Sequence, residues 1–185
     1  MMAKAHKIGM MTTLAALFIA AATPAYASAA PTKPTDPIRA AEPTPFLTAE
    51  QSDAYAAALK FVVSAGLTKN LSLLLLEEVK QSDEVNAAID RNGMDDVQVK
   101  VVRAIRAAQK AHGGEWAAVL ARAYSQFFTA SEMQSILKER ENSAHFIRLL
   151  QLQEKLAQTI RLEGDAIFNQ ARTEVLGTVA LRLSR

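Results

Sequence analysis

The sequence of 185 residues contains no cysteine. This absence excludes disulfides and thiolate metal sites, and it excludes a lipid anchor attached to a leader cysteine. Glycine is scarce as well, with seven residues, and no glycine-rich phosphate-binding loop is present. The protein is therefore compatible with an oxidising compartment but uses none of its thiol chemistry.

Proline is absent from most of the chain. All six prolines lie between Pro24 and Pro45, and none follows. Pro-rich segments are extended and act as spacers. The long proline-free remainder, rich in alanine, leucine, glutamine and charged residues, has the composition of a helical array. We therefore expect a Pro-rich disordered tether over residues 28–47 and one all-helical domain over residues 48–185.

An excess of charge of one sign is also lacking. The formal net charge is +2, with 21 basic and 19 acidic residues. Lys4 and Lys7 are the only charged side chains before residue 28, apart from His6 if protonated, so removing them leaves 19 basic residues against 19 acidic ones. A neutral chain has no general electrostatic footprint for nucleic acid, and we expect no nucleic-acid partner.

The first residues have the pattern of a secretory signal peptide. A basic start precedes the apolar run from Met10 to Ala22, and Ala25 and Ala27 form an A-x-A cleavage pattern. We predict a signal peptide over residues 1–27, with cleavage after Ala29 or Ala30 as alternatives, and a periplasmic or secreted protein. The apolar run is shorter than the ~20 residues of a transmembrane helix, so no transmembrane segment is expected in the mature chain.

Caps and apolar spacing divide the proline-free region into helices. Gly66, Asn92-Gly93 and Gly113-Gly114 are expected to end helices, and Thr48 with Gln51 is expected to form a capping box at the first one. The fold class predicted is all-α, a single irregular bundle of five to seven helices with a long C-terminal helix. The expected helices cover residues 48–66, 69–80, 82–92, 97–112, 115–128, a segment that begins after Thr129, and 144–183, the last with a possible break at Gly164 or Gly177.

The segment Val97–Val102, "VQVKVV", alternates like a β-strand, and Asn92-Gly93 before it is a common hairpin turn. No other segment alternates, so a strand here would have no partner. We therefore favour a helix, with the strand as the alternative.

The stretch Tyr124–Leu137, "YSQFFTASEMQSIL", predicts a corner between two helices. Thr129 and Glu132 have the spacing of a capping box, in which each side chain binds the other residue's backbone amide. Phe128 and Met133 flank this box at the spacing of a hydrophobic staple, which sets the angle of entry into a helix. We interpret these four residues as a structural corner.

This stretch resembles the signature of the domain of unknown function 2059 family, which comprises bacterial secreted all-helical proteins. The matching positions are Phe128, Thr129, Glu132, Met133, Ile136 and Leu137, and the segment Ala58–Leu75 is similar to an earlier part of the family pattern. Glu139-Arg140 and the residues 142–145 replace the family's usual Phe-Tyr and Ser-Pro-x-Gly. The resemblance covers about residues 48–160 and implies a secreted helical protein, with no established reaction or catalytic residue to carry over.

One row of charges indicates a possible interaction surface. Lys100, Arg103, Arg106 and Lys110 fall within a ~120° sector of a helix, and no acidic residue lies between Val97 and Gly114. The functional interpretation is a docking stripe for anionic lipid or an acidic partner. The alternative is a solvated face that acidic residues of neighbouring helices, Glu77, Glu78, Asp83 or Glu84, partly neutralise.

No residue pattern points to a reaction. His112 and His145 lack metal-ligand spacing; His112 is expected in the last turn of its helix, and His145 in the first turn of the long C-terminal one. Ser143 is interpreted as a helix cap, and adjacent carboxylates on a helix do not converge on one proton. We predict no cofactor, no metal site and no catalytic residue.

Two further interpretations concern the helical domain. The aromatic stripe from Trp116 to Phe128 is expected to mark the centre of the core. The C-terminal segment after Gly164 is expected to exceed the length of the domain, so that it either folds back at Gly164 or meets another molecule with its apolar side. We favour contact with another molecule, with a second copy of the chain as one candidate. The leading hypothesis is thus a non-enzymatic binding protein of the cell envelope, whose partner is a protein or a small apolar ligand. The alternative is a hydrolase with a site assembled across helices.

Overall fold

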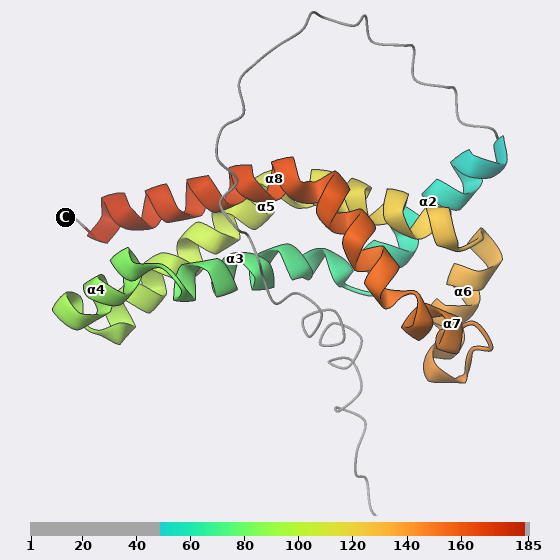
Figure 1. The fold of residues 1–185 in the computed structure, drawn as a ribbon, viewed down its shortest axis with the longest axis horizontal. Coiled ribbons are helices and arrows are strands. Elements are labelled where there is room, and N and C mark those ends of the chain that lie inside the picture. Colours follow the sequence, from blue (N-terminus) through green and yellow to red (C-terminus); the bar gives the residue numbers. More distant parts are fainter. Residues whose placement is uncertain (1–48, 184–185) are drawn as a thin grey trace, which may run out of the picture.

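The computed structural model describes residues 49–183, which form an elongated all-α domain (Figure 1). The predicted signal peptide and tether, and the capping box at Thr48, lie outside the described residues. The predicted bundle of five to seven helices is confirmed for the described part, and so is its long C-terminal helix. The helices are α2 (Ala49–Ser64), α3 (Asn70–Lys80), α4 (Asp83–Asn92), α5 (Met94–Phe127), α6 (Ala130–Glu139), α7 (Phe146–Gln151) and α8 (Gln153–Leu183), with 3-10 turns η1 (Leu67–Lys69) and η2 (Arg140–Asn142).

Two of the predicted helix ends are formed by glycines with positive φ. Gly66, with φ 72°, follows α2, and Gly93, with φ 84°, separates α4 from α5. The region 97–102 is helical, and the strand alternative is wrong. Val97 and Val101, one helical turn apart, are buried, whereas Val99 between them is 52% exposed. The tertiary core therefore selects the four-residue period over the two-residue one.

The predicted helix end at Gly113-Gly114 is wrong. Helix α5 runs through both glycines, neither of which has a positive φ. Each glycine costs a helix interior about 1 kcal/mol relative to alanine. Buried residues continue on both sides of the pair, with Ala108 and His112 before it and Trp116 after it, and the burial of one continuous face outweighs that local cost.

The C-terminal segment also differs from the prediction. Instead of one helix from residue 144, the short α7 is followed by a break at Leu152 and then by α8, which passes unbroken through Gly164 and Gly177. Gly164 is buried, and the absence of a side chain at this position leaves room for Trp116 and Val119 of α5. It therefore acts as a contact point between two helices, and not as a helix breaker.

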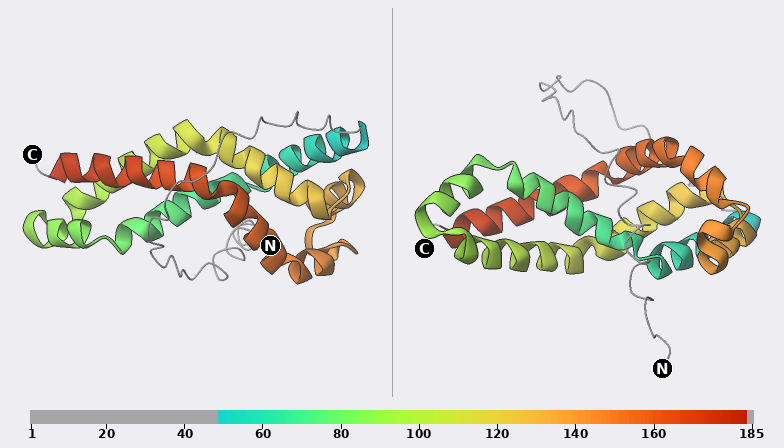
Figure 2. Two further views of the ribbon diagram at one scale, coloured as in Figure 1. Left: turned by 45° about the horizontal axis from the view of Figure 1, so that its top comes forward. Right: turned by 90° about the horizontal axis from the view of Figure 1, so that it is seen from below.

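Helices α5 and α8 form the long axis of the molecule, and each makes its most extensive contacts with the other (Figures 1 and 2). Helix α2 packs on α5 and α6, while α3 and α4 cover the other end of α5. After Gly164, α8 buries Phe168, Ala171, Val175 and Val179 in the common core. The expectation of an uncovered apolar side after Gly164 is therefore wrong. The prediction of a homo-oligomer through this helix was based on that expectation, so this argument for it no longer applies.

Within the described range, no single helix combines the length and apolar character of a membrane span. In this range, one bent pair of helical segments, Glu50–Ser64 and Leu67–Lys80, has the length and composition of a membrane span when the two are taken together. The angle between them is 68°. Leu71 and Leu75 of this pair are buried in the core of the domain.

Candidate functional site

The predicted basic stripe lies on α5, but it divides into two parts. Lys100 forms an ion pair with Asp96, one turn earlier, at 2.8 Å, and its side chain is only 27% exposed. Arg103, Arg106 and Lys110 are exposed, and none forms an ion pair within the part of the chain that the structure describes. We call these last three residues the basic row.

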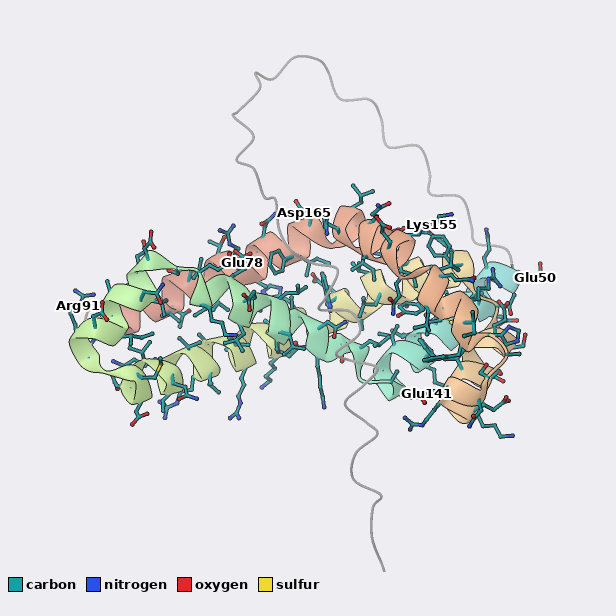
Figure 3. All side chains as sticks on the ribbon, turned by 60° about the horizontal axis from the view of Figure 1, so that its bottom comes forward. Glu50, Glu78, Arg91, Glu141, Lys155 and Asp165 are labelled. Atoms are coloured by element: carbon teal, nitrogen blue, oxygen red, sulfur yellow. The ribbon has the colours of Figure 1, made fainter. Side chains whose placement is uncertain are left out.

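The acidic residues expected to neutralise the stripe bind elsewhere or form no ion pair in residues 49–183. Glu77 pairs with Lys80 of its own helix, and Glu78 pairs with Arg172 of α8 at 2.7 Å. Figure 3 shows Glu78 on α3, where that helix passes beside α8. The charge of the basic row is therefore left uncompensated by the neighbours named in the prediction.

The corner between α5 and α6 has the predicted geometry. The Thr129 hydroxyl accepts a hydrogen bond from the Glu132 amide at 3.3 Å, and the Glu132 carboxylate accepts one from the Thr129 amide at 2.8 Å. Phe128 and Met133 are both buried in the hydrophobic core. The capping box thus joins two helices whose flanking apolar residues enter the same core.

Arg148 of α7 adds contacts to this corner that the sequence did not reveal. Its guanidinium donates to the Glu132 carboxylate and, at 2.9 Å, to the carbonyl oxygen of Phe127, and its Cζ lies 5.4 Å from the centre of the Phe128 ring. These contacts span 16 to 21 residues of sequence, so no local pattern indicates them. The corner is thereby tied to α7 as well as to α5.

The electrostatics of the corner hold Glu132 in its ionised form. Burial raises the pKa of the Glu132 carboxyl, but hydrogen bonds from Thr129 and the positive charges of Arg148 and His145 more than reverse this, so the net pKa is lowered. The imidazole Nδ1 of His145 lies 3.6 Å from this carboxylate. His145 therefore belongs to the corner, where it precedes the short α7, and the prediction that it lies in the first turn of the long C-terminal helix is wrong.

The prediction that His112 lies in the last turn of a helix is wrong, because α5 continues past it to Phe127. Its buried imidazole Nε2 lies 2.8 Å from the Glu174 carboxylate of α8, whose side chain is half-exposed. The hydrogen bond with His112 is the largest effect on Glu174 and lowers its pKa. The pair links the middle of α5 to the C-terminal half of α8.

Among the hollows on the surface of residues 49–183 are two shallow grooves. One, of about 370 Å³, lies between α2 and α6 and is lined by Ala57, Lys60, Phe61, Met133, Gln134, Leu137 and Lys138. The other, of about 250 Å³, lies between α4 and α8 and is lined by Ser82, Glu84, Val85, Arg91, Leu176, Val179 and Ala180. The sequence did not reveal either groove, since each combines segments far apart in the chain.

The residues 49–183 contain no cluster of three or more His, Asp or Glu side chains able to hold a metal ion. The Ser143 hydroxyl bonds to Ser135 Oγ at 2.7 Å and to the backbone amide of His145 at 3.2 Å, and none of the hydrogen bonds in this part of the chain joins it to an imidazole. Among the carboxyl groups of residues 49–183, Glu132 and Glu174 have displaced pKa values, and both pKa values are lowered. A general acid requires the opposite shift.

No protein-family model, curated protein or solved structure matches the chain.

Proposed function

We propose that this chain is a secreted, non-enzymatic binding protein of the cell envelope that docks an acidic protein partner through the basic row of α5. The observation that carries the proposal is the cluster of Arg103, Arg106 and Lys110 on one exposed helical face without an acidic partner in the described residues. Elsewhere in this part of the chain, several basic residues are paired: Lys80, Arg122, Arg148 and Arg172 each contact a carboxylate.

The basic row places like charges close together on one helix. Like charges three or four residues apart on a helix destabilise it by about 0.2–0.5 kcal/mol per pair. Arg103 and Arg106 are three residues apart, and Arg106 and Lys110 are four apart. A binding partner with carboxylates would turn this repulsion into attraction and would gain association rate through electrostatic steering.

An acidic protein fits the row better than a lipid surface does. Each basic residue near an anionic membrane contributes about 1 kcal/mol of binding free energy. Three such residues correspond to a dissociation constant above about 1 mM. Stable membrane attachment requires a second signal, such as an apolar face that inserts into the bilayer. The exposed apolar residue Val99 lies on the same side of α5 as the basic row, but one valine offers little area for such insertion. A protein partner can place carboxylates against the two guanidinium groups in bidentate geometry, which adds both energy and specificity.

Crosslinking in the periplasm followed by pulldown tests the proposal. The variant carrying R103E, R106E and K110E is expected to lose partners that the wild-type chain captures. The matched control is K155E with R161E on α8, because both residues are exposed and form no ion pair in the described part. Equal capture by all three proteins would refute the row as the docking surface. Row-dependent binding to anionic vesicles, without protein crosslinks, would identify lipid as the partner instead.

The proposed secretion of the protein has its own test. Mass spectrometry of the native protein is expected to find an N-terminus at Ser28, Ala30 or Pro31. A cytoplasmic species that retains Met1 would contradict secretion, whatever the outcome for the basic row.

A further inference from the structure

The groove between α2 and α6 lies at the end of the molecule where α2, α6 and α7 meet (Figure 1). One wall comes from α2, with Ala57 and Phe61, and the other from α6, with Met133 and Leu137. Phe61 and Met133 are nearly fully buried and form the floor, whereas Ala57 and Leu137 are half-buried. The groove therefore offers a narrow apolar surface between two helices.

The groove carries positive charge. Lys60 of α2 and Lys138 of α6 both line it and are exposed. Neither lysine forms an ion pair with any residue between 49 and 183, and no acidic residue lines the groove. Two ammonium groups thus flank an apolar floor, and their aliphatic stems extend that floor toward solvent.

The α5–α6 corner sets the shape of the groove. Met133 follows the capping box by one residue and is also part of the groove floor. The box at Thr129 and the contact of Arg148 with Glu132 hold the first turn of α6 at a defined angle. The orientation of Leu137 and Lys138, which lie farther along α6, follows from that angle. The corner is thus what places the α6 wall opposite α2.

We propose that this groove binds an unbranched aliphatic chain that ends in a carboxylate, a fatty-acid-type anion. The chain would lie along Phe61, Met133 and Leu137, and the carboxylate would contact Lys60 and Lys138. The groove volume of about 370 Å³ is at the small end of the range of roughly 300–1,000 Å³ for ligand pockets. Methionine repacks readily around flexible apolar ligands, which suits an extended alkyl chain.

An acidic helical peptide fits the groove less well. A helix docked in a groove presents apolar anchors over two or more turns, at i, i+3, i+4 and i+7. An α-helix with its side chains is about 10–12 Å wide, so two turns of it exceed the groove volume of about 370 Å³, whereas a single alkyl chain is much thinner. The site is distinct from the basic row and does not depend on the function proposed for that row.

Laurate, below its micellar concentration, is the probe for this site. Titration calorimetry on the mature full chain is expected to show binding that weakens at least tenfold in the K60E/K138E variant. Dodecanol, which lacks the carboxylate, is expected to bind at least tenfold more weakly and to be insensitive to that variant. The K69E variant is the control, since Lys69 is exposed and lies outside the groove. The R103E/R106E/K110E variant is expected to bind laurate like the wild type.

A second measurement locates the probe. In protein with isotope-labelled methionine methyl groups, laurate is expected to shift the Met133 resonance, which the Met133→Leu variant identifies. No laurate binding, unchanged affinity in K60E/K138E, or binding without a Met133 shift would each overturn the proposal. Lysine-dependent binding of a glutamate-rich helical peptide in the absence of laurate binding would also overturn it, and would assign the groove to a protein partner.

Discussion

Gly164 of α8 lies directly against the indole ring of Trp116 of α5. A Cβ atom at position 164 would come within 2.6 Å of Trp116 Cζ3 and 3.3 Å of Val119 Cγ1. The indole is itself nearly fully buried, so it has little space into which to move. The contact between the two longest helices in the described part therefore depends, at this point, on the absence of a side chain at position 164.

Gly164→Ala is expected to lower the free energy of unfolding by up to about 2 kcal/mol. Overpacking a buried site costs about 1–3 kcal/mol, and the gain of about 1 kcal/mol in helix propensity offsets part of it. Gly177→Ala is the matched control, because Gly177 lies in the same helix and a Cβ there would meet nothing within 4 Å. That control is expected to gain about 0.5–1 kcal/mol. Chemical denaturation of both variants measures the difference, and a stabilised Gly164→Ala would contradict the close packing.

Thr129→Ala is expected to destabilise the protein by about 1 kcal/mol, because it removes the acceptor of the α6 capping box. Far-UV circular dichroism should still show a mainly helical protein. Thr173→Ala is the control, since the Thr173 hydroxyl only donates to the carbonyl of Asn169, one turn earlier in the same helix. Its denaturation midpoint should stay the same or rise slightly. An unchanged midpoint in Thr129→Ala would show that the cap contributes no stability.

Acidification is expected to destabilise the fold through Glu132 and Glu174. The folded-state pKa of each carboxyl lies below its ordinary value of 4.5, so the unfolded chain binds protons first as the pH falls. The stability that these groups contribute is fully present above pH ~4.5 and is lost as the pH falls through their lowered folded-state values. Denaturation midpoints between pH 7 and pH 3 measure this decline. The decline should be shallower in Glu132→Gln, and an identical pH dependence in that variant would argue against a role for this carboxylate.

Phe168→Ala is expected to cost about 3 kcal/mol or more, because the ring is buried in the core shared by α5 and α8. Leu162→Ala, on the same helix, should change stability by less than about 0.5 kcal/mol, because Leu162 is 82% exposed. Equal effects of the two substitutions, measured by chemical denaturation, would mean that the apolar side of α8 after Gly164 is not covered within the chain.

Local chemistry was sufficient to predict most helix ends and the corner. Gly66 and Gly93 adopt a positive φ that other residues rarely take, and a capping box involves side chains and amides only three residues apart. These features depend on interactions within one turn of the chain, and the residues that make them can be read directly.

Features that depend on distant segments were decided by the tertiary structure. Gly113, Gly114 and Gly164 look like helix breakers in isolation, but the burial of continuous faces of α5 and α8 outweighs their low propensity. The contacts of Arg148 with Glu132 and of His112 with Glu174 join residues 16 and 62 positions apart, and the α2–α6 groove joins Phe61 with Met133. The sequence determined where helices can start and which residues are apolar. Only the packing of α8 along α5 determined which helices continue and which lysines come together, because these outcomes depend on burial between segments whose proximity no local pattern encodes.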